Sequence, residues 1–259
     1  MTYQLLVATM HQTDASIYDE MNLKSDAIIV NQCDVNRIEE MDIGSNRVKM
    51  ISLCERGVGL SRNTALMRAD ADIVEFADDD MIFSETYKED VLRAFEQQPD
   101  ADMIIFSVDS LNPERPLPKI RKFERINRFQ GLKYGCARLA VRREKLIYNN
   151  ISFSLLFGGG AKYGSGEDSL FIQDCFRAGL HVYRSPLKVA DVKQDTSTWF
   201  NGYTDKYYRD KGALFKALLP RLCHVYAVFT SLKYRKPVKE TLRILKLFEE
   251  GIREFRKKQ

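Results

Sequence analysis

Three consecutive aspartates, Asp78, Asp79 and Asp80, are the residues of this sequence best suited to hold a metal ion. They follow an apolar run at residues 73–77, which predicts a buried β-strand that ends where the acids begin. In an extended chain Asp78 and Asp80 point to one side and Asp79 to the other. A hard dication, Mn²⁺ or Mg²⁺, would relieve the repulsion between these carboxylates and bridge to a diphosphate. The run therefore suits a metal site, for which we rank Asp80 as the first ligand and Asp78 as the second.

The same acids would also suit a solvated turn between a strand and a helix. In that interpretation one of the aspartates, or Ser84, caps the helix that follows. The three aspartates alone do not separate the two interpretations, whereas the sequence before them does.

The segment that precedes the aspartates resembles family 2 glycosyltransferases of the GT-A fold. The matching residues are, in chain order, Gly57, Gly59, Ser61, Arg62, Asn63, Ala69, Asp70 and the strand that leads to the three aspartates. The resemblance implies an enzyme that depends on a nucleotide sugar and a divalent metal, with Asp78 and Asp79 near the ribose or the metal. Arg62 can bind a phosphate or a carboxylate through its guanidinium group. A purely structural ion pair with one of the aspartates is the alternative for Arg62.

The resemblance also implies a place for the nucleotide at the ends of the first two predicted strands. Thr9, Met10 and His11 follow the first strand, and Asn31 and Gln32 end the second. The amides can pair with a pyrimidine edge, although the family usually has two aspartates after the second strand. His11 also fits a loop position that contacts no ligand. A UDP-sugar is the donor that the resemblance favours.

Glu167 and Asp168 begin a predicted helix that ends near Gly179. Acids in a first helical turn also occur simply because they complement the helix dipole. The pair is similar to the Glu-Asp motif of the same family, whose Asp is the usual catalytic base. The resemblance therefore implies that Asp168 takes the proton of an acceptor hydroxyl in an inverting transfer, and that Glu167 orients the site or binds the acceptor.

Many GT-A enzymes contribute a late histidine to the metal, but residues 189–199 contain none. By position, Asp191 or Lys193 would act near the diphosphate, unless they are ordinary surface charges. Trp199, the only tryptophan, could stack on a sugar or pack in the interior.

Apolar runs and helical patterns alternate along the first hundred residues and must position these groups. Strands are expected at 4–8, 27–31, 47–52, 73–77 and 103–108, and helices at 14–22, 59–69 and 84–97. This alternation predicts an α/β fold, which the resemblance specifies as GT-A: a doubly wound, mostly parallel sheet flanked by helices. Such sheets bind ligands beyond the carboxyl ends of their strands. We expect a catalytic domain at 1–205, with a nucleotide half at about 1–110 and an acceptor half at about 111–205.

Residues 206–259 form a basic extension with 15 Lys and Arg against 5 Asp and Glu, although the whole chain carries only +4. An apolar stripe at helical spacing predicts amphipathic helices, and its members are Leu242, Leu245, Phe248, Ile252 and Phe255. The stripe either lies on an anionic membrane surface or packs on the catalytic domain or another subunit, as in a homo-oligomer. The apolar stretch at 214–232 is interrupted by charges and a proline, which disfavours a membrane span.

The remaining composition limits the class of protein. Five scattered cysteines without a Cys-x-x-Cys pair exclude a zinc ribbon and favour a reducing compartment, and no signal peptide is evident. No nucleic-acid-binding module is found. We therefore expect a cytoplasmic enzyme, or one bound peripherally at the inner face of the plasma membrane.

The sequence thus predicts a transfer of sugar to a glycan or a lipid-linked acceptor in surface polysaccharide synthesis. A nucleotidyltransferase on a similar fold and a non-catalytic, membrane-associated assembly factor are the alternatives.

Overall fold

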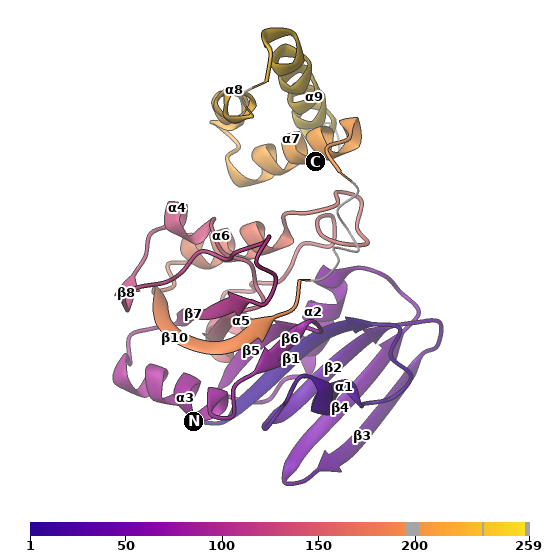
Figure 1. The fold of residues 1–259 in the computed structure, drawn as a ribbon, viewed down its shortest axis with the longest axis vertical. Coiled ribbons are helices and arrows are strands. Elements are labelled where there is room, and N and C mark those ends of the chain that lie inside the picture. The colour runs from indigo at the N-terminus through magenta and orange to yellow at the C-terminus, as the bar shows by residue number, and fades with distance from the viewer. Residues whose placement is uncertain (195–201, 235, 257–259) are drawn as a thin grey trace.

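The computed structural model describes residues 1–194, 202–234 and 236–256 of the 259-residue chain (Figure 1). One sheet has the strand order β3-β4-β2-β1-β5-β9-β7-β10-β6, with β8 paired to β10. The strands are β1 (Tyr3–Met10), β2 (Asp26–Gln32), β3 (Arg37–Ile43), β4 (Asn46–Leu53), β5 (Ile73–Asp78), β6 (Met81–Phe83), β7 (Met103–Ser110), β8 (Glu124–Arg125), β9 (Leu139–Arg142) and β10 (Val182–Val192). The helices are α1 (Ile17–Glu20), α2 (Val58–Arg68), α3 (Tyr87–Gln97), α4 (Arg128–Gly131), α5 (Arg143–Tyr148), α6 (Glu167–Arg177), α7 (Asp205–Leu218), α8 (Cys223–Lys233) and α9 (Val238–Arg256).

The centre of the sheet is parallel. Strands β4, β2, β1 and β5 lie side by side in that order, and every neighbouring pair among them runs in the same direction. The chain leaves β1 toward β2 on one side and reaches β5 on the other, which makes the carboxyl end of β1 a topological switch point. The expected α/β sheet is thus confirmed, and it places the ends of β1, β2 and β5 at one edge.

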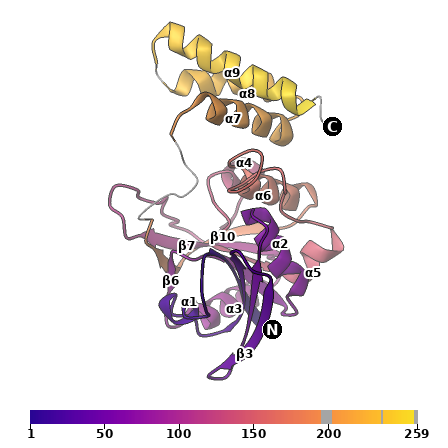
Figure 2. The same ribbon diagram turned by 90° about the vertical axis from the view of Figure 1, so that its right-hand side faces the viewer.

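Helices cover both faces of the sheet because successive strand residues point to opposite sides. On one face Leu5 and Val7 of β1 join a core with α1 and α3. On the other face Leu6 joins a second core with α2, α5 and α6 (Figure 2). The second core lies directly under the starts of α2 and α6, so it determines where Arg62 and the acids Glu167 and Asp168 are held.

The structure also contains antiparallel strands that the apolar pattern did not predict. Strand β3 pairs antiparallel with β4 at the edge of the sheet, and most of its side chains are exposed or half-buried, so it has no apolar run. Strand β9 pairs antiparallel with both β5 and β7.

The helix expected at 14–22 was wrong in length, because α1 has only four residues. Before it, the backbone N–H of Ser16 donates to the Asp14 carboxylate in a turn, and after it Asn22 adopts a φ of 55°.

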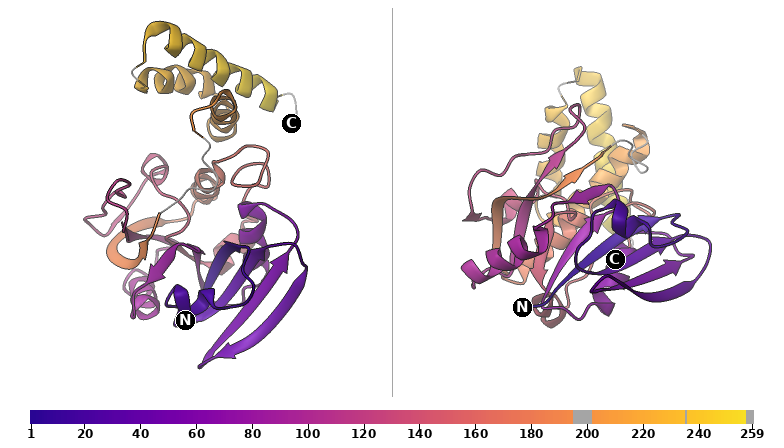
Figure 3. Two further views of the ribbon diagram at one scale, coloured as in Figure 1. Left: turned by 45° about the vertical axis from the view of Figure 1, so that its right-hand side comes forward. Right: turned by 60° about the horizontal axis from the view of Figure 1, so that its bottom comes forward.

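The three C-terminal helices pack on one another at one end of the molecule (Figure 3). Helices α7 and α9 cross with their backbones in contact: a Cβ on Gly251 would lie 1.9 Å from the Arg209 carbonyl oxygen, and one on Gly212 would lie 2.1 Å from the Phe248 carbonyl oxygen. No side chain larger than hydrogen fits at either position. The proposed division of the chain at 205/206 falls in the first turn of α7.

A small apolar cluster joins these helices to the α/β part of the chain. Leu214 and Phe255 pack with Phe157, Tyr163 and Leu170. The stripe predicted from sequence is therefore used mainly inside the protein, with Phe248, Ile252 and Phe255 buried and Leu242 exposed. Within the described residues no helix has the length and apolar character that a membrane crossing requires.

We expect Gly251→Ala to destabilise the protein by roughly 1–3 kcal/mol, because the added methyl group overlaps the backbone of α7. The same change in an unobstructed helix would stabilise it by up to about 1 kcal/mol. Denaturant unfolding followed by circular dichroism measures the difference. The matched control is Lys246→Ala, at an exposed position of the same helix, which we expect to change stability by less than about 0.5 kcal/mol. A Gly251→Ala protein as stable as the wild type would contradict the close crossing.

Glu75 of β5 is fully buried on the face of the sheet that packs against α1 and α3. The hydroxyl of Tyr3 donates to its Oε2 at 2.6 Å, and Oε1 has no hydrogen-bond partner among the described residues. Burial raises the pKa of Glu75 to about 7, from an ordinary value of 4.5. The folded state therefore keeps this proton at a pH where the unfolded chain has lost it.

Stability should consequently fall as the pH rises from about 4.5 to about 7, because the folded state binds more protons than the unfolded state in that window. The full effect is about 3 kcal/mol. We expect Glu75→Gln to remove this component from the pH dependence of the unfolding free energy. Glu96→Gln, at an exposed position of α3, should keep the wild-type dependence. Identical pH profiles for wild type and Glu75→Gln would be inconsistent with this role.

Candidate active site

A cleft of about 950 Å³ opens over the carboxyl ends of β1, β2 and β5. Its walls are formed by the switch point of the sheet, by the starts of α2 and α6, and by the loops at residues 115–117 and 193–194. It is lined by Ala8, Thr9, Met10, His11, Gln32, Val58, Arg62, Asp78, Asp79, Asp80, Arg115, Pro116, Leu117, Gly159, Glu167, Asp168, Lys193 and Gln194. The cleft thus brings together residues that are up to 186 positions apart in the chain, from Ala8 to Gln194.

The guanidinium group of Arg62 lies at the bottom of this cleft, with only 3 % of the side chain exposed. One of its nitrogens is 2.8 Å from Asp78 Oδ1, and the other is 2.6 Å from Asp168 Oδ1. The central carbon of the guanidinium group, Cζ, also lies 5.4 Å from the centre of the Phe153 ring. Burial opposes the positive charge, but Asp78, Asp168 and Glu167 together raise the pKa of Arg62 well above its ordinary value. Arg62 is therefore a permanent cation that ties the two acidic motifs to each other.

The three aspartates differ in their partners. Asp78 is paired with Arg62, and Asp79 Oδ2 accepts a 2.6 Å hydrogen bond from the hydroxyl of Thr9. Asp80 forms no ion pair with another described residue. Loss of hydration and the neighbouring charge of Asp78 raise the pKa of Asp80 to about 6, against the backbone N–H of Gln194, which lowers it. Of the three carboxylates, that of Asp80 is the one left for an added cation.

The described residues contain no group of three or more His, Cys, Asp and Glu side chains arranged to hold a metal ion by themselves. A hard cation prefers oxygen ligands and can take several of them from a bound phosphate and from water. Asp80 in an open cleft fits a metal bound in this shared way, and it does not fit a closed site made entirely by protein.

Glu167 and Asp168 lie in the first turn of α6 and face the same cleft. Glu167 Oε1 is 3.5 Å from Arg62, a longer contact than the 2.6 Å of Asp168. Burial and then the charge of Asp168 raise the pKa of Glu167 to about 7, although Arg62 lowers it. Glu167 can therefore hold a proton near neutral pH, while Asp168 makes the closer contact with the Arg62 cation.

Helix α7 packs against the start of α6. The side chain of Leu214 fills the space beside Gly166, where a Cβ would lie 2.5 Å from it, and Gly166 has a φ of +118°. Asp210 accepts a 2.9 Å hydrogen bond from the backbone N–H of Gly164. The C-terminal extension is thus in direct contact with the loop that carries Glu167 and Asp168.

The residues predicted to bind the nucleotide divide into two groups. Thr9, Met10, His11 and Gln32 line the cleft, and Gln32 accepts a 2.6 Å hydrogen bond from the backbone N–H of Gly57 at the start of α2. Asn31 does not line it. Its amide is fully buried and exchanges hydrogen bonds of 3.0 and 2.8 Å with the backbone of Gln12, so Asn31 shapes the loop after β1.

The late positions also differ from the sequence prediction. Asp191 lies within β10, opposite Ile82 of β6, and pairs with Lys188 at 2.6 Å. It does not line the cleft, because the neighbouring lysine and the strand pairing hold it outside. Lys193, the alternative, does line the cleft, and its backbone N–H donates to the Asp80 carbonyl oxygen at 2.9 Å. Trp199 lies outside the described residues.

The sequence prediction missed the loop that follows β7. Arg115, Pro116 and Leu117 of this loop line the cleft opposite the aspartates. Neither Arg115 nor Lys193 is ion-paired within the described part of the chain, so both cations are available to an anionic ligand. In the sequence, the cluster of prolines and cations after residue 112 indicates a loop, but it does not indicate that this loop lines the cleft.

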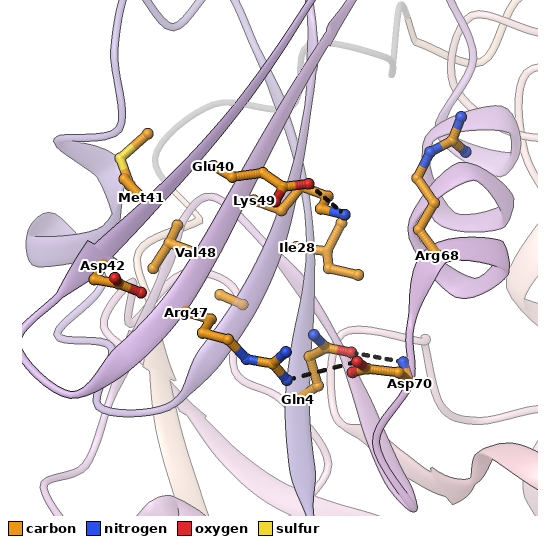
Figure 4. Close-up of a pocket in the computed structure, with 11 residues that line it drawn as sticks. Gln4, Ile28, Glu40, Met41, Asp42, Arg47, Val48, Lys49, Arg68 and Asp70 are labelled. Atoms are coloured by element: carbon orange, nitrogen blue, oxygen red, sulfur yellow. Dashed lines mark hydrogen bonds and ion pairs between the residues drawn. The ribbon is translucent and has the colours of Figure 1, made fainter.

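A second cavity, of about 270 Å³, lies at the opposite edge of the sheet, beside β3 and β4 (Figure 4). Its charges neutralise one another: Arg47 pairs with Asp26 and Asp70, and Lys49 pairs with Glu40. It lies at the amino ends of the parallel strands, away from the edge where such sheets bind ligands.

Comparison with solved structures supports the same fold. Residues 1–349 of S. aureus TarS in complex with UDP-GlcNAc align with a TM-score of 0.67 and 14 % identity, over 97 % of this chain and 81 % of that chain. A second TarS 1–349 structure gives 0.65 and 13 %, over 100 % and 92 % of the two chains, and the complex with UDP gives 0.64 and 14 %, over 97 % and 81 %. No curated protein matches the sequence.

The family model described as glycosyl transferase family 2 matches residues 9–150. This match runs from the end of β1 to the end of α5, and it includes Arg62 and the three aspartates. Because it covers more than half of the chain, and because the fold and the cleft agree with it, this protein belongs to glycosyl transferase family 2.

Proposed function

We propose that the protein is an inverting transferase that moves a sugar from a UDP-sugar to a hydroxyl group of a glycan or a lipid-linked acceptor. The observation that carries this proposal is the double ion pair of Arg62, which joins Asp78 after β5 to Asp168 at the start of α6 inside one cleft. A transfer between two substrates requires a donor side and an acceptor side in contact, and this arrangement supplies them.

The donor side would hold the nucleotide over the carboxyl ends of β1 and β2. Gln32 and the backbone after Thr9 would contact the base, and Arg115 and Lys193, which also line the cleft, would contact the diphosphate. The structures of TarS contain UDP-GlcNAc and UDP, and the two chains share their fold. UDP-GlcNAc is therefore the first donor to examine.

Asp80 would hold Mn²⁺ or Mg²⁺ together with the diphosphate. Such a cation would neutralise the charge that develops on the departing nucleoside diphosphate. The support is chemical: Asp80 is a carboxylate in an open cleft without a cationic partner, next to two further acids.

Asp168 would take the proton from the attacking hydroxyl, and Glu167 would support it. Arg62 is 0.9 Å closer to Asp168 than to Glu167, so Asp168 is the acid whose carboxylate meets the cation directly. A protonated Glu167 spares Asp168 the repulsion of a second charge and could donate a hydrogen bond to the acceptor. Surface polysaccharide synthesis at the inner face of the plasma membrane is the setting that we propose.

The metal role of Asp80 can be measured by calorimetric titration of UDP with and without Mn²⁺. We expect Mn²⁺ to tighten UDP binding to the wild type by about tenfold or more, which corresponds to about 1.4 kcal/mol. Asp80→Asn should lose most of this increment. Asp191→Asn should keep it, because Asp191 is paired with Lys188 outside the cleft. Equal Mn²⁺ dependence in the two variants would refute the assignment.

The base can be identified by comparing two isosteric variants in a glycosyl-transfer assay that detects released UDP. Asp168→Asn should lower kcat by about 10²–10⁴, the usual contribution of a general base. Glu167→Gln mimics the protonated side chain and should lower kcat by less than about tenfold. A greater loss in Glu167→Gln would assign the base to Glu167. Release of pyrophosphate from UTP in place of UDP from the sugar nucleotide would support a nucleotidyltransferase.

A further inference from the structure

Helix α8 has the reverse of the usual arrangement for a surface helix. It turns small residues toward α7 and α9, burying Cys223, Ala227 and Ser231. Its large apolar side chains point to solvent, each with between 45 % and 67 % of its surface exposed: Leu222, Val225, Val228, Phe229 and Leu232. We call these five residues the α8 outer face. They recur at helical spacing along one side, so they form one continuous surface.

An exposed apolar surface of this kind marks a place where the protein meets something other than water. The α8 outer face lies at the end of the molecule remote from the sheet, since α8 is farther from it than α7 in both ribbon views (Figures 1 and 2). Leu242 of α9 is also exposed. Val238, the first residue of α9, is exposed as well, whereas most other apolar residues of the C-terminal helices are buried or partly buried.

The segment of the chain that contains this face carries charge of one sign. Residues 220–239 contain no Asp or Glu, and their cations are Arg221, Lys233, Arg235, Lys236 and Lys239. The ammonium group of Lys233 lies 4.5 Å from the centre of the Phe229 ring, which puts a cation directly beside the apolar face. A surface that complements this face must therefore be apolar and anionic together.

The acids of the C-terminal helices do not offset these cations. Every Asp and Glu in the described part of the helices is engaged in an ion pair: Asp205 and Glu240 with Arg243, Asp210 with Lys206, Glu249 with His224, Glu250 with Arg209 and Glu254 with Lys162. The segment 206–259 has a net charge of +10 and the preceding 205 residues have −6. An anionic surface would attract this end of the molecule and repel the other.

We propose that the α8 outer face docks on an anionic lipid bilayer. The apolar side chains would enter the boundary between headgroups and acyl chains, with the helix lying in the plane of the interface, and the surrounding lysines and arginines would contact lipid phosphates. A symmetric dimer through the same face would press two sets of cations against each other, which disfavours a second copy of this chain as the occupant.

The docking goes beyond the proposed transfer reaction and does not depend on it. It also changes the membrane-facing element expected from the sequence, because the stripe of α9 is largely buried whereas α8, which has no acidic residue, is free.

Sedimentation of the full chain with vesicles tests the proposal without any sugar donor. The vesicles are phosphatidylcholine alone, or phosphatidylcholine with about one-third phosphatidylglycerol. We expect binding to the anionic vesicles to be at least about tenfold tighter, and to weaken as salt rises from about 0.05 to about 0.5 M. The double variant Val225→Ser/Phe229→Ser should lose most of this binding. The matched control is Ile38→Ser, which removes an equally exposed apolar side chain from edge strand β3 and should bind as the wild type does.

A second variant, Lys233→Gln/Lys236→Gln, leaves the apolar face intact and should reduce anionic selectivity by about tenfold. Thermal unfolding would check that each variant is folded. If one double variant does not fold, the other still provides the test. Binding that is unchanged in both variants, or no preference of the wild type for anionic vesicles, would overturn the proposal. So would a wild-type dimer in analytical ultracentrifugation that Val225→Ser/Phe229→Ser dissociates, because that result assigns the face to a second copy.

Discussion

The buried guanidinium of Arg62 is the constraint on which the rest of the site depends. A charge that is almost fully removed from water is tolerated only if opposite charges satisfy it at close range. Asp78 and Asp168 do so, and they come from the end of β5 and the start of α6. Two motifs that are 90 residues apart must therefore meet over one side chain. The same contact leaves Asp78 less available to an added cation, because its carboxylate is already paired.

Three residues of one chemical type acquire three different roles in this way. Asp78 is neutralised by Arg62, Asp79 is held by the hydroxyl of Thr9, and Asp80 is left without a cationic partner. These contacts leave Asp80, expected from the sequence to be the first metal ligand, open to a cation, but they do not favour Asp78, the expected second ligand, because Arg62 already pairs with it. A carboxylate already paired with an arginine offers less to a dication than one that is unpaired.

The sequence offered two alternatives for the C-terminal helices, packing on the rest of the protein or exposure of an apolar side. The structure divides these two roles among the three helices. Through Leu214 and Asp210, α7 packs against the glycines that precede Glu167 and so helps to fix the start of α6. The glycine crossing of α7 and α9 fixes the position of both helices. With α7 and α9 occupied internally, α8 is the element left with an apolar side toward solvent.

Local pattern was enough to predict the central strands, because an apolar run bounded by polar residues has the same meaning wherever the strand is placed. Two separate motifs pointed to Arg62 with the aspartates and to the Glu167-Asp168 pair for the same reason: the spacing within each motif is local. Strand β3 could not be predicted in this way, since an exposed edge strand has no apolar run.

The fate of individual side chains was decided only by tertiary contacts. The sequence suggested Asn31 and Asp191 as ligands, but in the fold the Asn31 amide bonds to Gln12 and Asp191 pairs with Lys188. Arg115 lines the cleft although it lies outside the motif, so its place there could not be predicted from spacing. Which face of α8 is buried followed equally from its neighbours. Residue type and spacing determine what a side chain can do, whereas the partner that it meets across the fold determines what remains free to do it.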